Sequence, residues 1–187
     1  IPLKVKVILL GDPEIYYMLQ DYDQEFTELF RVLADFDQYL DSNEENLNDY
    51  AHLIRQRAYK HNYPHVSDEA VLELVRYALR RAEHQNKISA NIVQVNDLLD
   101  EAFYLWNKAG SEGELTANYV TLALAAKQRR TGRMSEAWLG EIKEKQVLID
   151  IDGQHIGKVN GLTVLEIGDS VFGTPARITA TVYAGSQ

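Results

Sequence analysis

The sequence has 187 residues, of which 45% are hydrophobic and 25% are charged, and its formal net charge is −9. This length allows one domain or two small ones, with enough apolar side chains to build a core. The acidic balance argues against a nucleic acid as partner, because such binding depends on lysine and arginine to neutralise phosphates. The absence of cysteine excludes disulfides and thiol chemistry and fits a cytoplasmic location. No apolar run approaches the roughly 20 residues that span a bilayer, so we expect no membrane contact.

An apolar run opens the chain, from Leu3 to Leu10, and ends at the turn residues Gly11-Asp12-Pro13. Such a run predicts a buried strand, which needs partner strands in a sheet. The segment from Arg177 to Tyr183 has a period of two residues and predicts another strand close to the last residue. We therefore expect both ends of the chain to be cuts inside a larger protein.

Helical periodicity covers residues 42 to 145. The capping box from Ser42 to Glu45 predicts the start of a first helix that runs to about Lys60. Ser67 is expected to cap a second helix, and Thr116 is expected to cap a fourth. The apolar faces of the second, third and fourth helices are Val71, Leu74, Val75, Ala78, Leu79 and Ala82; Val95, Leu98, Leu99, Ala102, Leu105 and Trp106; and Tyr119, Val120, Ala123 and Leu124. The third helix should end at Gly110, and a last amphipathic stretch should run from Ser135 to about Lys145.

The chain changes to the period of strands after residue 146. Val147 to Val159 is interpreted as a hairpin around the turn Asp152-Gly153. Asn160-Gly161 is a second turn signal, and further strands are expected at Leu162 to Ile167 and Ala176 to Tyr183. The predicted fold class is α+β, a mainly helical bundle followed by a small antiparallel β segment.

The C-terminal residues carry a family resemblance. Their ordered series resembles the start of the peptidase domain in Lon-like ATP-dependent serine proteases: Leu148 to Gly153, Ile156 to Leu165, Gly168-Asp169, Phe172-Gly173 and Pro175 to Ala180. The helical part is similar to the preceding region of the family in the right order, at Pro64-His65, Leu98 to Ala102 and Leu115 to Val120.

The resemblance implies three segments. Residues 1–40 would be the C-terminal end of an AAA+ nucleotide-binding core, residues 41–133 the helical AAA+ lid, and residues 134–187 a linker helix with the first strands of the peptidase domain. It also implies ATP and Mg as cofactors of the whole protein, protein substrates, and self-association as a ring, expected to be a hexamer. In this scheme the lid passes nucleotide-dependent motion to the peptidase domain.

The sequence lacks the motifs that carry the chemistry of this family. It contains no Gly-x-x-x-x-Gly-Lys-Ser/Thr loop to cradle phosphates. The family cleaves peptides with a Ser-Lys dyad, in which a lysine of lowered pKa activates the serine, and the resemblance places that dyad beyond Gln187. The phosphate loop and the acidic magnesium motif would precede Ile1. We therefore expect no catalytic residue, no bound cofactor and no proteolytic activity in the chain itself.

Two residues are candidates for nucleotide contact by the resemblance. Asn91 stands at the start of the third lid helix, where the family carries a nucleotide-sensing arginine. Arg31 is the candidate for the arginine that completes the ATP site of a neighbouring subunit. Since asparagine cannot neutralise a phosphate as arginine does, Asn91 suggests a branch with weakened or lost ATPase activity.

Other motifs have simpler interpretations. Gly168-Asp169-Ser170 has the order of a nucleophile motif but falls between two predicted strands, so we interpret it as a loop, and the spacing gives a Lys158–Ser170 dyad little support. His61 and His65 have the spacing of a metal pair, but Pro64 breaks the helix between them, so we expect solvent-facing histidines and no metal.

Two groups of side chains are candidates for contact with a nucleic acid or with another protein domain. The basic run from Lys127 to Arg133 is interpreted as a solvated helix end rather than a nucleic-acid contact. The tyrosines of the first third are interpreted as a surface patch that packs against a partner domain rather than as a substrate path: Tyr16, Tyr17, Tyr22, Tyr39, Tyr50, Tyr59 and Tyr63.

The sequence thus favours a segment of a Lon-like ATP-dependent serine endopeptidase for protein degradation. Two alternatives stay open. A catalytically decayed, Lon-derived scaffold or adaptor protein is favoured by Asn91. A standalone helical interaction domain with a β appendage would ignore the family resemblance altogether.

Overall fold

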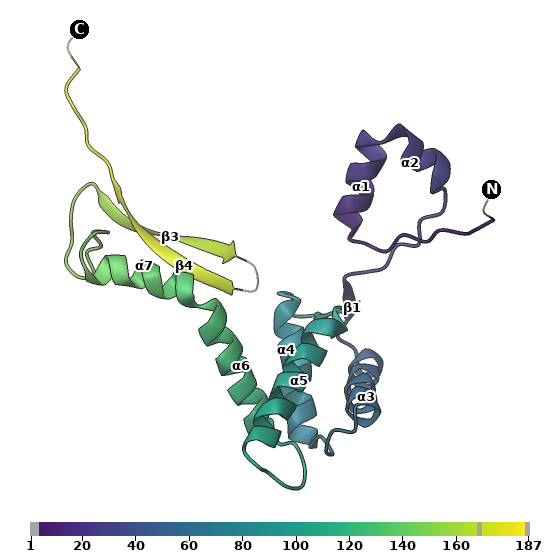
Figure 1. Ribbon diagram of the computed structural model, residues 1–187. Coiled ribbons are helices and arrows are strands. Elements are labelled where there is room, and N and C mark those ends of the chain that lie inside the picture. Colours follow the sequence, from purple (N-terminus) through teal and green to yellow (C-terminus); the bar gives the residue numbers. More distant parts are fainter. Residues whose placement is uncertain (1–3, 168–169, 186–187) are drawn as a thin grey trace.

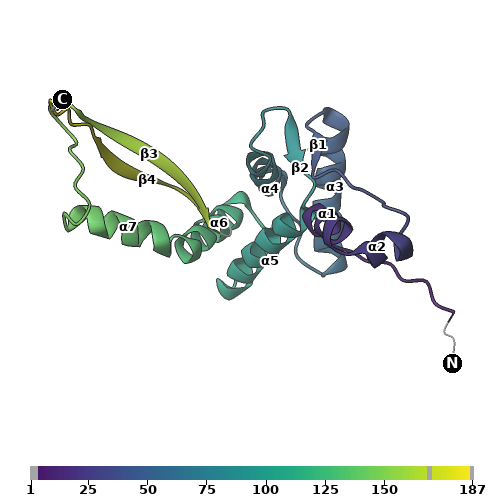
Figure 2. The same cartoon turned by 90° about the horizontal axis from the view of Figure 1, so that it is seen from above.

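A computed structural model describes residues 4–167 and 170–185. The described chain is α+β, as predicted, with a bundle of α3 to α6 at its centre (Figure 1). The N-terminal helices α1 and α2 lie on one side of this bundle, and α7 with the β3–β4 hairpin lies on the other (Figure 2). Two small antiparallel sheets, β1–β2 and β3–β4, complete the described architecture.

The predicted strand at the start of the chain is wrong for its described part. Residues 4–12 form neither helix nor strand, and their apolar side chains are exposed, Leu10 by 94%. A strand requires main-chain bonds to a neighbour, and no described segment supplies them here. Two short helices follow instead, α1 (Pro13–Tyr22) and α2 (Gln24–Leu29), which the sequence analysis did not predict.

The short helices α1 and α2 have local causes. Pro13 occupies the first turn of α1, where its missing N–H is harmless. The Asp23 side chain accepts hydrogen bonds from the main-chain N–H groups of Glu25 and Phe26 and so caps α2. Phe26 is buried between Tyr16 and Phe30, with ring centroids 5.6 and 5.2 Å away. This aromatic contact holds the two helices together.

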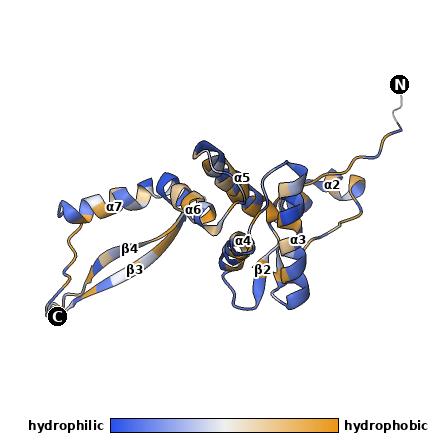
Figure 3. Cartoon of the chain, turned by 90° about the horizontal axis from the view of Figure 1, so that it is seen from below, coloured by the Kyte–Doolittle hydropathy of each residue, from blue (hydrophilic) through white to orange (hydrophobic). Residues whose placement is uncertain are grey.

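The central bundle consists of α3 (Glu44–Lys60), α4 (Asp68–Arg81), α5 (Ile92–Lys108) and α6 (Ala117–Thr131). The predicted apolar faces are confirmed: except for Ala82, which is buried outside the main cluster, their members lie in one buried cluster or pack against it. Leu74, Leu99 and Ala123 are fully enclosed, together with Ile54 of α3, for which no face was predicted. Figure 3 shows apolar residues on the sides of these helices that face one another. The bundle therefore holds the principal core.

The predicted cap of α4 is confirmed, whereas the cap of α3 is shifted by one residue and the predicted cap of α6 lacks its side-chain hydrogen bond. Ser67 caps α4 as predicted, because its hydroxyl accepts from the Ala70 N–H at 3.2 Å. The predicted capping box at Ser42 is wrong by one residue: Asn43 caps α3, and its Oδ1 accepts from the Asn46 N–H at 2.8 Å. The fourth helix begins after Thr116 as predicted, although the Thr116 side chain makes no cap hydrogen bond.

Two main-chain contacts close the bundle. Strand β1 (Tyr39–Asp41) pairs antiparallel with β2 (Lys87–Ser89), which joins the segment before α3 to the segment before α5. A parallel bridge between Val66 and Leu115 joins the start of α4 to the start of α6. Both contacts link positions that are remote in sequence.

The C-terminal β segment differs from its prediction. Residues 147–157 form no strand, so the predicted hairpin around Asp152-Gly153 is wrong. One hairpin forms instead, from β3 (Lys158–Ile167) and β4 (Ser170–Thr179), and it follows α7 (Arg133–Lys143). The predicted turn Asn160-Gly161 lies inside β3, because these residues pair with Arg177 and Ala176.

We expect Tyr50→Phe to leave stability unchanged to within about 1 kcal/mol at neutral pH, because the buried Tyr50 hydroxyl has no hydrogen-bond partner among the described residues. Burial, and secondarily Tyr77, raises the pKa of Tyr50 to about 12 from 10.0. A raised folded-state pKa stabilises the fold fully below pH 10, and this contribution is lost as the pH rises towards 12. Urea unfolding should therefore show that the variant loses less stability than the original protein across this range.

Candidate functional site

The start of α5 is the candidate site, because the sequence analysis placed Asn91 there. Asn91 occupies the cap position of α5, and its side chain is exposed and makes no cap hydrogen bond. Its main-chain N–H donates to the Ser89 hydroxyl at 3.2 Å. The Asn91 amide is thus available to a partner in solution and presents hydrogen-bonding groups without charge.

The second candidate, Arg31, lies in the segment between α2 and β1. Its side chain is exposed, and its Nε donates to the Glu28 carbonyl oxygen at 3.0 Å. Arg31 belongs to the stretch that leads into β1, whereas Asn91 follows β2. The β1–β2 pairing therefore brings the end of the segment that carries Arg31, at Gln38, beside the turn that carries Asn91, while Arg31 itself contacts α2 (Figure 1).

A shallow pocket on the α3–α5 face lies beside this turn, because Ile92, next to Asn91, is one of its lining residues. Within it, Arg57 is held by Asp100, whose Oδ2 lies 2.9 Å from the Arg57 Nη2, and Tyr63 donates to the same carboxylate at 3.0 Å. The hydrogen bond that Arg57 donates to Asp100 is the main cause that raises the pKa of Arg57. The pocket is lined by Leu53, Gln56, Arg57, Lys60, His61, Ile92 and Asn96.

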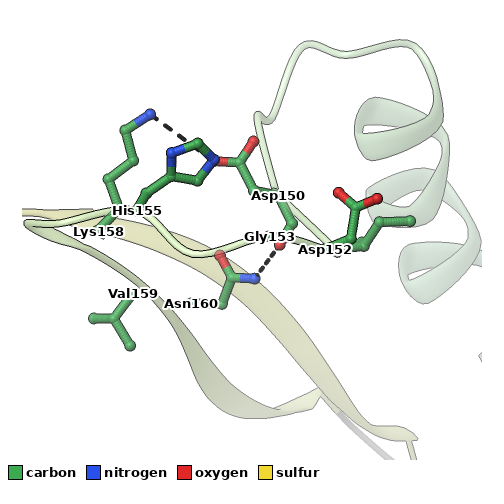
Figure 4. Close-up of a pocket in the computed structure, with 8 residues that line it drawn as sticks. Asp150, Asp152, Gly153, His155, Lys158, Val159 and Asn160 are labelled. Atoms are coloured by element: carbon green, nitrogen blue, oxygen red, sulfur yellow. Dashed lines mark hydrogen bonds and ion pairs between the residues drawn. The ribbon is translucent and has the colours of Figure 1, made fainter.

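A second shallow pocket lies at the base of the β3–β4 hairpin, where the chain arrives from α7 (Figure 4). Asn160 Nδ2 donates to the Asp150 carbonyl oxygen at 2.6 Å, and the Lys158 Nζ lies 3.9 Å from the Asp150 carboxylate. These contacts shape the loop and leave opposite charges next to each other. Among the described residues, no group of three or more His, Cys, Asp or Glu side chains is placed to hold a metal ion.

The simpler interpretations of the remaining motifs can be compared with the structure. His61 and His65 are both exposed, as expected of solvent-facing histidines. Gly168 and Asp169 lie outside the described residues, so that part of the Gly-Asp-Ser loop prediction stays a prediction. Lys158 pairs with Thr179 and Ser170 pairs with Ile167, which puts the two residues at opposite ends of the hairpin and argues against a dyad.

The basic run at the end of α6 makes contacts within the bundle. Both Nη atoms of Arg130 donate to the Glu101 carboxylate at 2.6 Å. Lys127 donates to the Tyr77 hydroxyl at 3.2 Å. Arg129 and Arg130 lie in the last turn of α6, where positive charge complements the helix dipole. These contacts agree with the interpretation of this run as a helix end.

The predicted tyrosine patch is wrong, because the tyrosines do not share one surface. Tyr22 and Tyr59 are exposed by 87% and 84%, but Tyr50 is buried in the bundle core. Tyr63 stacks on Phe103 with ring centroids 4.0 Å apart. Sequence proximity suggested a patch, whereas the helical period sends these side chains to different faces.

The acid dependence of the β1–β2 contact follows from Asp41. Its hydrogen bond to Lys87, and then the Lys87 charge, hold the pKa of Asp41 below its ordinary value of 3.8. A lowered folded-state pKa stabilises the fold above pH 3.8, and the contribution is lost as the pH falls below that value. Unfolding titrations should therefore show Asp41→Asn less stable than the original protein at pH 7, with the difference shrinking in acid.

Two protein-family models match parts of the chain. The model described as "Archaeal LonB, AAA+ ATPase LID domain" matches residues 65–130, from the residues before α4 almost to the end of α6. The model described as "LonB-like, AAA domain" matches residues 1–37, which include α1 and α2. The part of the bundle from α4 to α6 is thus similar to an AAA+ ATPase lid domain, and residues 1–37 are similar to an AAA domain.

The chain is also similar to two curated proteins. The chain is 28% identical over 188 residues to a protein of Escherichia coli (strain K12) named "Putative Lon protease homolog". It is 26% identical over 186 residues to a protein of the same name from Haemophilus influenzae. These matches confirm the predicted resemblance: the chain is Lon-like. Each covers 98% of the chain but only 31% and 30% of the relatives, so the chain spans about a third of their length.

The candidate site can be compared with the needs of a bound nucleotide. The Asn91 amide suits a hydrogen bond to a phosphate oxygen, but the side chain carries no charge to neutralise one. The residue's role, and that of Arg31, stay predictions. Within the described part of the chain, no helix is long and apolar enough to cross a membrane.

Proposed function

We propose that the chain is the central part of a Lon-like ATP-dependent serine endopeptidase, in which residues 41–133 are the AAA+ lid and residues 134–187 begin the peptidase domain. The observation that carries the proposal is the bundle α3–α6, in which α5 starts directly after the exposed Asn91 and residues 65–130, which contain α4 and α5 and almost all of α6, match a lid model. Residues 1–40 would complete the AAA+ core, where ATP and Mg bind. Bond cleavage would take place outside the chain.

The hairpin supports the peptidase part of the proposal. Leu162 and Val164 lie on one face of β3, exposed by 71% and 64%. Val159 and its partner Ile178 lie on the opposite face and are exposed by 60% and 57%. A ribbon with apolar residues on both faces suits a sheet that is covered on both sides by further protein. The apolar segment 4–10 suits the AAA+ core for the same reason.

The proposed protein works as a ring, expected to be a hexamer, degrades protein substrates, and is cytoplasmic. The test is ATP-dependent cleavage of an unfolded protein by the full-length protein in the presence of Mg. Cleavage that requires ATP and disappears with a serine-directed inhibitor supports the proposal. Nucleotide binding without any cleavage contradicts the peptidase part of it.

A second candidate function is a Lon-derived scaffold or adaptor whose catalysis has decayed. The neutral Asn91 favours this candidate, because the family resemblance leads us to expect an arginine there. It predicts that the full-length protein assembles into oligomers but binds Mg·ATP weakly or not at all. Tight, Mg-dependent ATP binding would exclude a scaffold that has lost its nucleotide site.

A further inference from the structure

The β1–β2 clip, defined as residues 38–42 and 86–90, joins two segments that belong to different parts of the sequence. Its ladder pairs Tyr39 with Ser89, Leu40 with Ile88 and Asp41 with Lys87. Two flanking main-chain bonds extend it: Ala90 N–H donates to the Gln38 carbonyl at 2.9 Å, and Ser42 N–H donates to the Asn86 carbonyl at 3.0 Å. A salt bridge between Asp41 and Lys87, 2.7 Å long, lies across the pair.

Each half of the clip is fixed to the bundle. On the β2 side, Ile88 is fully buried in the main core. On the β1 side, the Asn46 side chain donates to the Asp41 carbonyl at 2.8 Å and ties the strand to the first turn of α3. The clip is thus the place where the incoming chain becomes part of the bundle.

The turn that carries Asn91 is built from clip residues. The Ser89 hydroxyl accepts from the Asn91 N–H, and the Ala90 carbonyl accepts from the Ile92 N–H at 2.9 Å. Ser89 is itself buried and pairs with Tyr39, while Ala90 is bonded to Gln38. The conformation of this turn therefore depends on residues that are held by the incoming segment.

The segment that leads from α2 into the clip, residues 30–38, has no helix or strand of its own. It includes Arg31 and lies between α2 and β1 (Figure 1). Movement of the preceding AAA-like stretch would reach the bundle first through residues 38–42. The geometry thus gives the clip a position between the two candidate nucleotide contacts.

We propose that the β1–β2 clip couples the segment that enters the lid to the turn that carries Asn91, so that both are held or released together. Its role in nucleotide response rests on the proposed function, because only that function puts a nucleotide near Asn91. The coupling itself is a property of the fold and can be measured without nucleotide.

The test uses hydrogen exchange of main-chain amides in the full-length protein. Lys87→Glu places two carboxylates across the clip, and we expect the amides of Ser42 and Ala90 to exchange about threefold faster, since exposed ion pairs are weak. The amides of Asn91 and Ile92 should accelerate with them. The charge swap Asp41→Lys with Lys87→Glu should restore slow exchange at all four.

A matched control is Arg76→Glu, which destroys a 2.6 Å ion pair with Glu73 on α4, outside the clip. It should leave exchange in the clip unchanged. Acceleration at Ser42 without acceleration at Asn91 and Ile92 in Lys87→Glu would overturn the proposed coupling. So would equal acceleration by the control.

A second experiment tests the coupling by the clip separately from the proposed nucleotide response. With Mg·ADP, the original protein should protect both the Asn91 turn and residues 38–42, whereas Lys87→Glu should protect the turn alone. Protection that spreads equally in both proteins contradicts the coupling. If the original protein shows no protection anywhere, the proposed nucleotide response fails, while the nucleotide-free measurement still decides whether the clip couples its two segments.

Discussion

Asn91→Arg is expected to tighten Mg·ATP binding by the full-length protein about tenfold. A hydrogen bond to a charged group contributes about 1.5 kcal/mol or more, and about 1.4 kcal/mol corresponds to a factor of ten in the dissociation constant. Arginine supplies the charge and the planar donors that asparagine lacks. Titration with a fluorescent ATP analogue measures the change.

The structure makes this substitution informative because it should cost little stability. The Asn91 side chain is exposed and makes no cap hydrogen bond, so its replacement removes neither a buried side chain nor a cap. The hydrogen bond to the Ser89 hydroxyl is donated by the main-chain N–H of residue 91 and survives the change. A change in affinity can then be attributed to the new charge.

Asn91→Gln is the matched control, since it lengthens the side chain and keeps it neutral. We expect its affinity to stay within about twofold of the original, because no full charge–phosphate interaction is added. Equal binding by Asn91→Arg and Asn91→Gln would mean that position 91 does not face the nucleotide. Failure of all three proteins to bind would favour the scaffold interpretation instead.

The helices of the bundle could be predicted because their signals are local. Ser67 and the apolar face from Val71 to Ala82 predict α4 within a single stretch of chain, and the structure buries that face. The cap of α3 was harder to predict because Ser42 and Asn43 are both able to cap a helix. The choice depends on the clip, in which Ser42 donates its N–H to Asn86, a residue remote in sequence.

The strands could not be predicted equally well, because a strand depends on its partner. The apolar residues 4–10 have the composition of a strand, yet the described chain offers them no ladder. In the hairpin, the register places Asn160-Gly161 opposite Arg177 and Ala176, so a local turn signal is overridden by pairing along the whole of β3. The turn at Asp152-Gly153 is not used to join strands for the same reason.

At the candidate site, too, the local feature could be predicted from the sequence and the contacts between remote segments could not. Asn91 was found from the resemblance, and its position at the start of a helix is confirmed. Its surroundings were missed, because β1 and β2 are only three residues long each and carry no periodic signal. The complementary charges of Asp41 and Lys87 were the one available hint, and they could be paired only after the topology was known.

The Asp100 carboxylate should be the polar group whose loss destabilises the bundle most. It accepts from Arg57 of α3 and from Tyr63 of the loop after α3, and it lies on α5 itself. Asp100→Ala leaves both donors without this acceptor, which we expect to lower the free energy of unfolding by about 2 kcal/mol. The Arg57 and Asp100 side chains are 33% and 35% exposed, so solvent partly screens their ion pair.

Urea unfolding of the original protein and three variants measures this effect. Tyr63→Phe removes one donor but keeps the stack on Phe103, so it should cost about 1 kcal/mol. Arg76→Ala breaks an exposed pair within α4 and should cost less than about 0.5 kcal/mol. If Asp100→Ala costs no more than Arg76→Ala, the carboxylate does not hold α3 to α5. The rigidity of the bundle would then rest on its apolar core alone, and nucleotide-dependent motion at the start of α5 would not need to carry α3 with it.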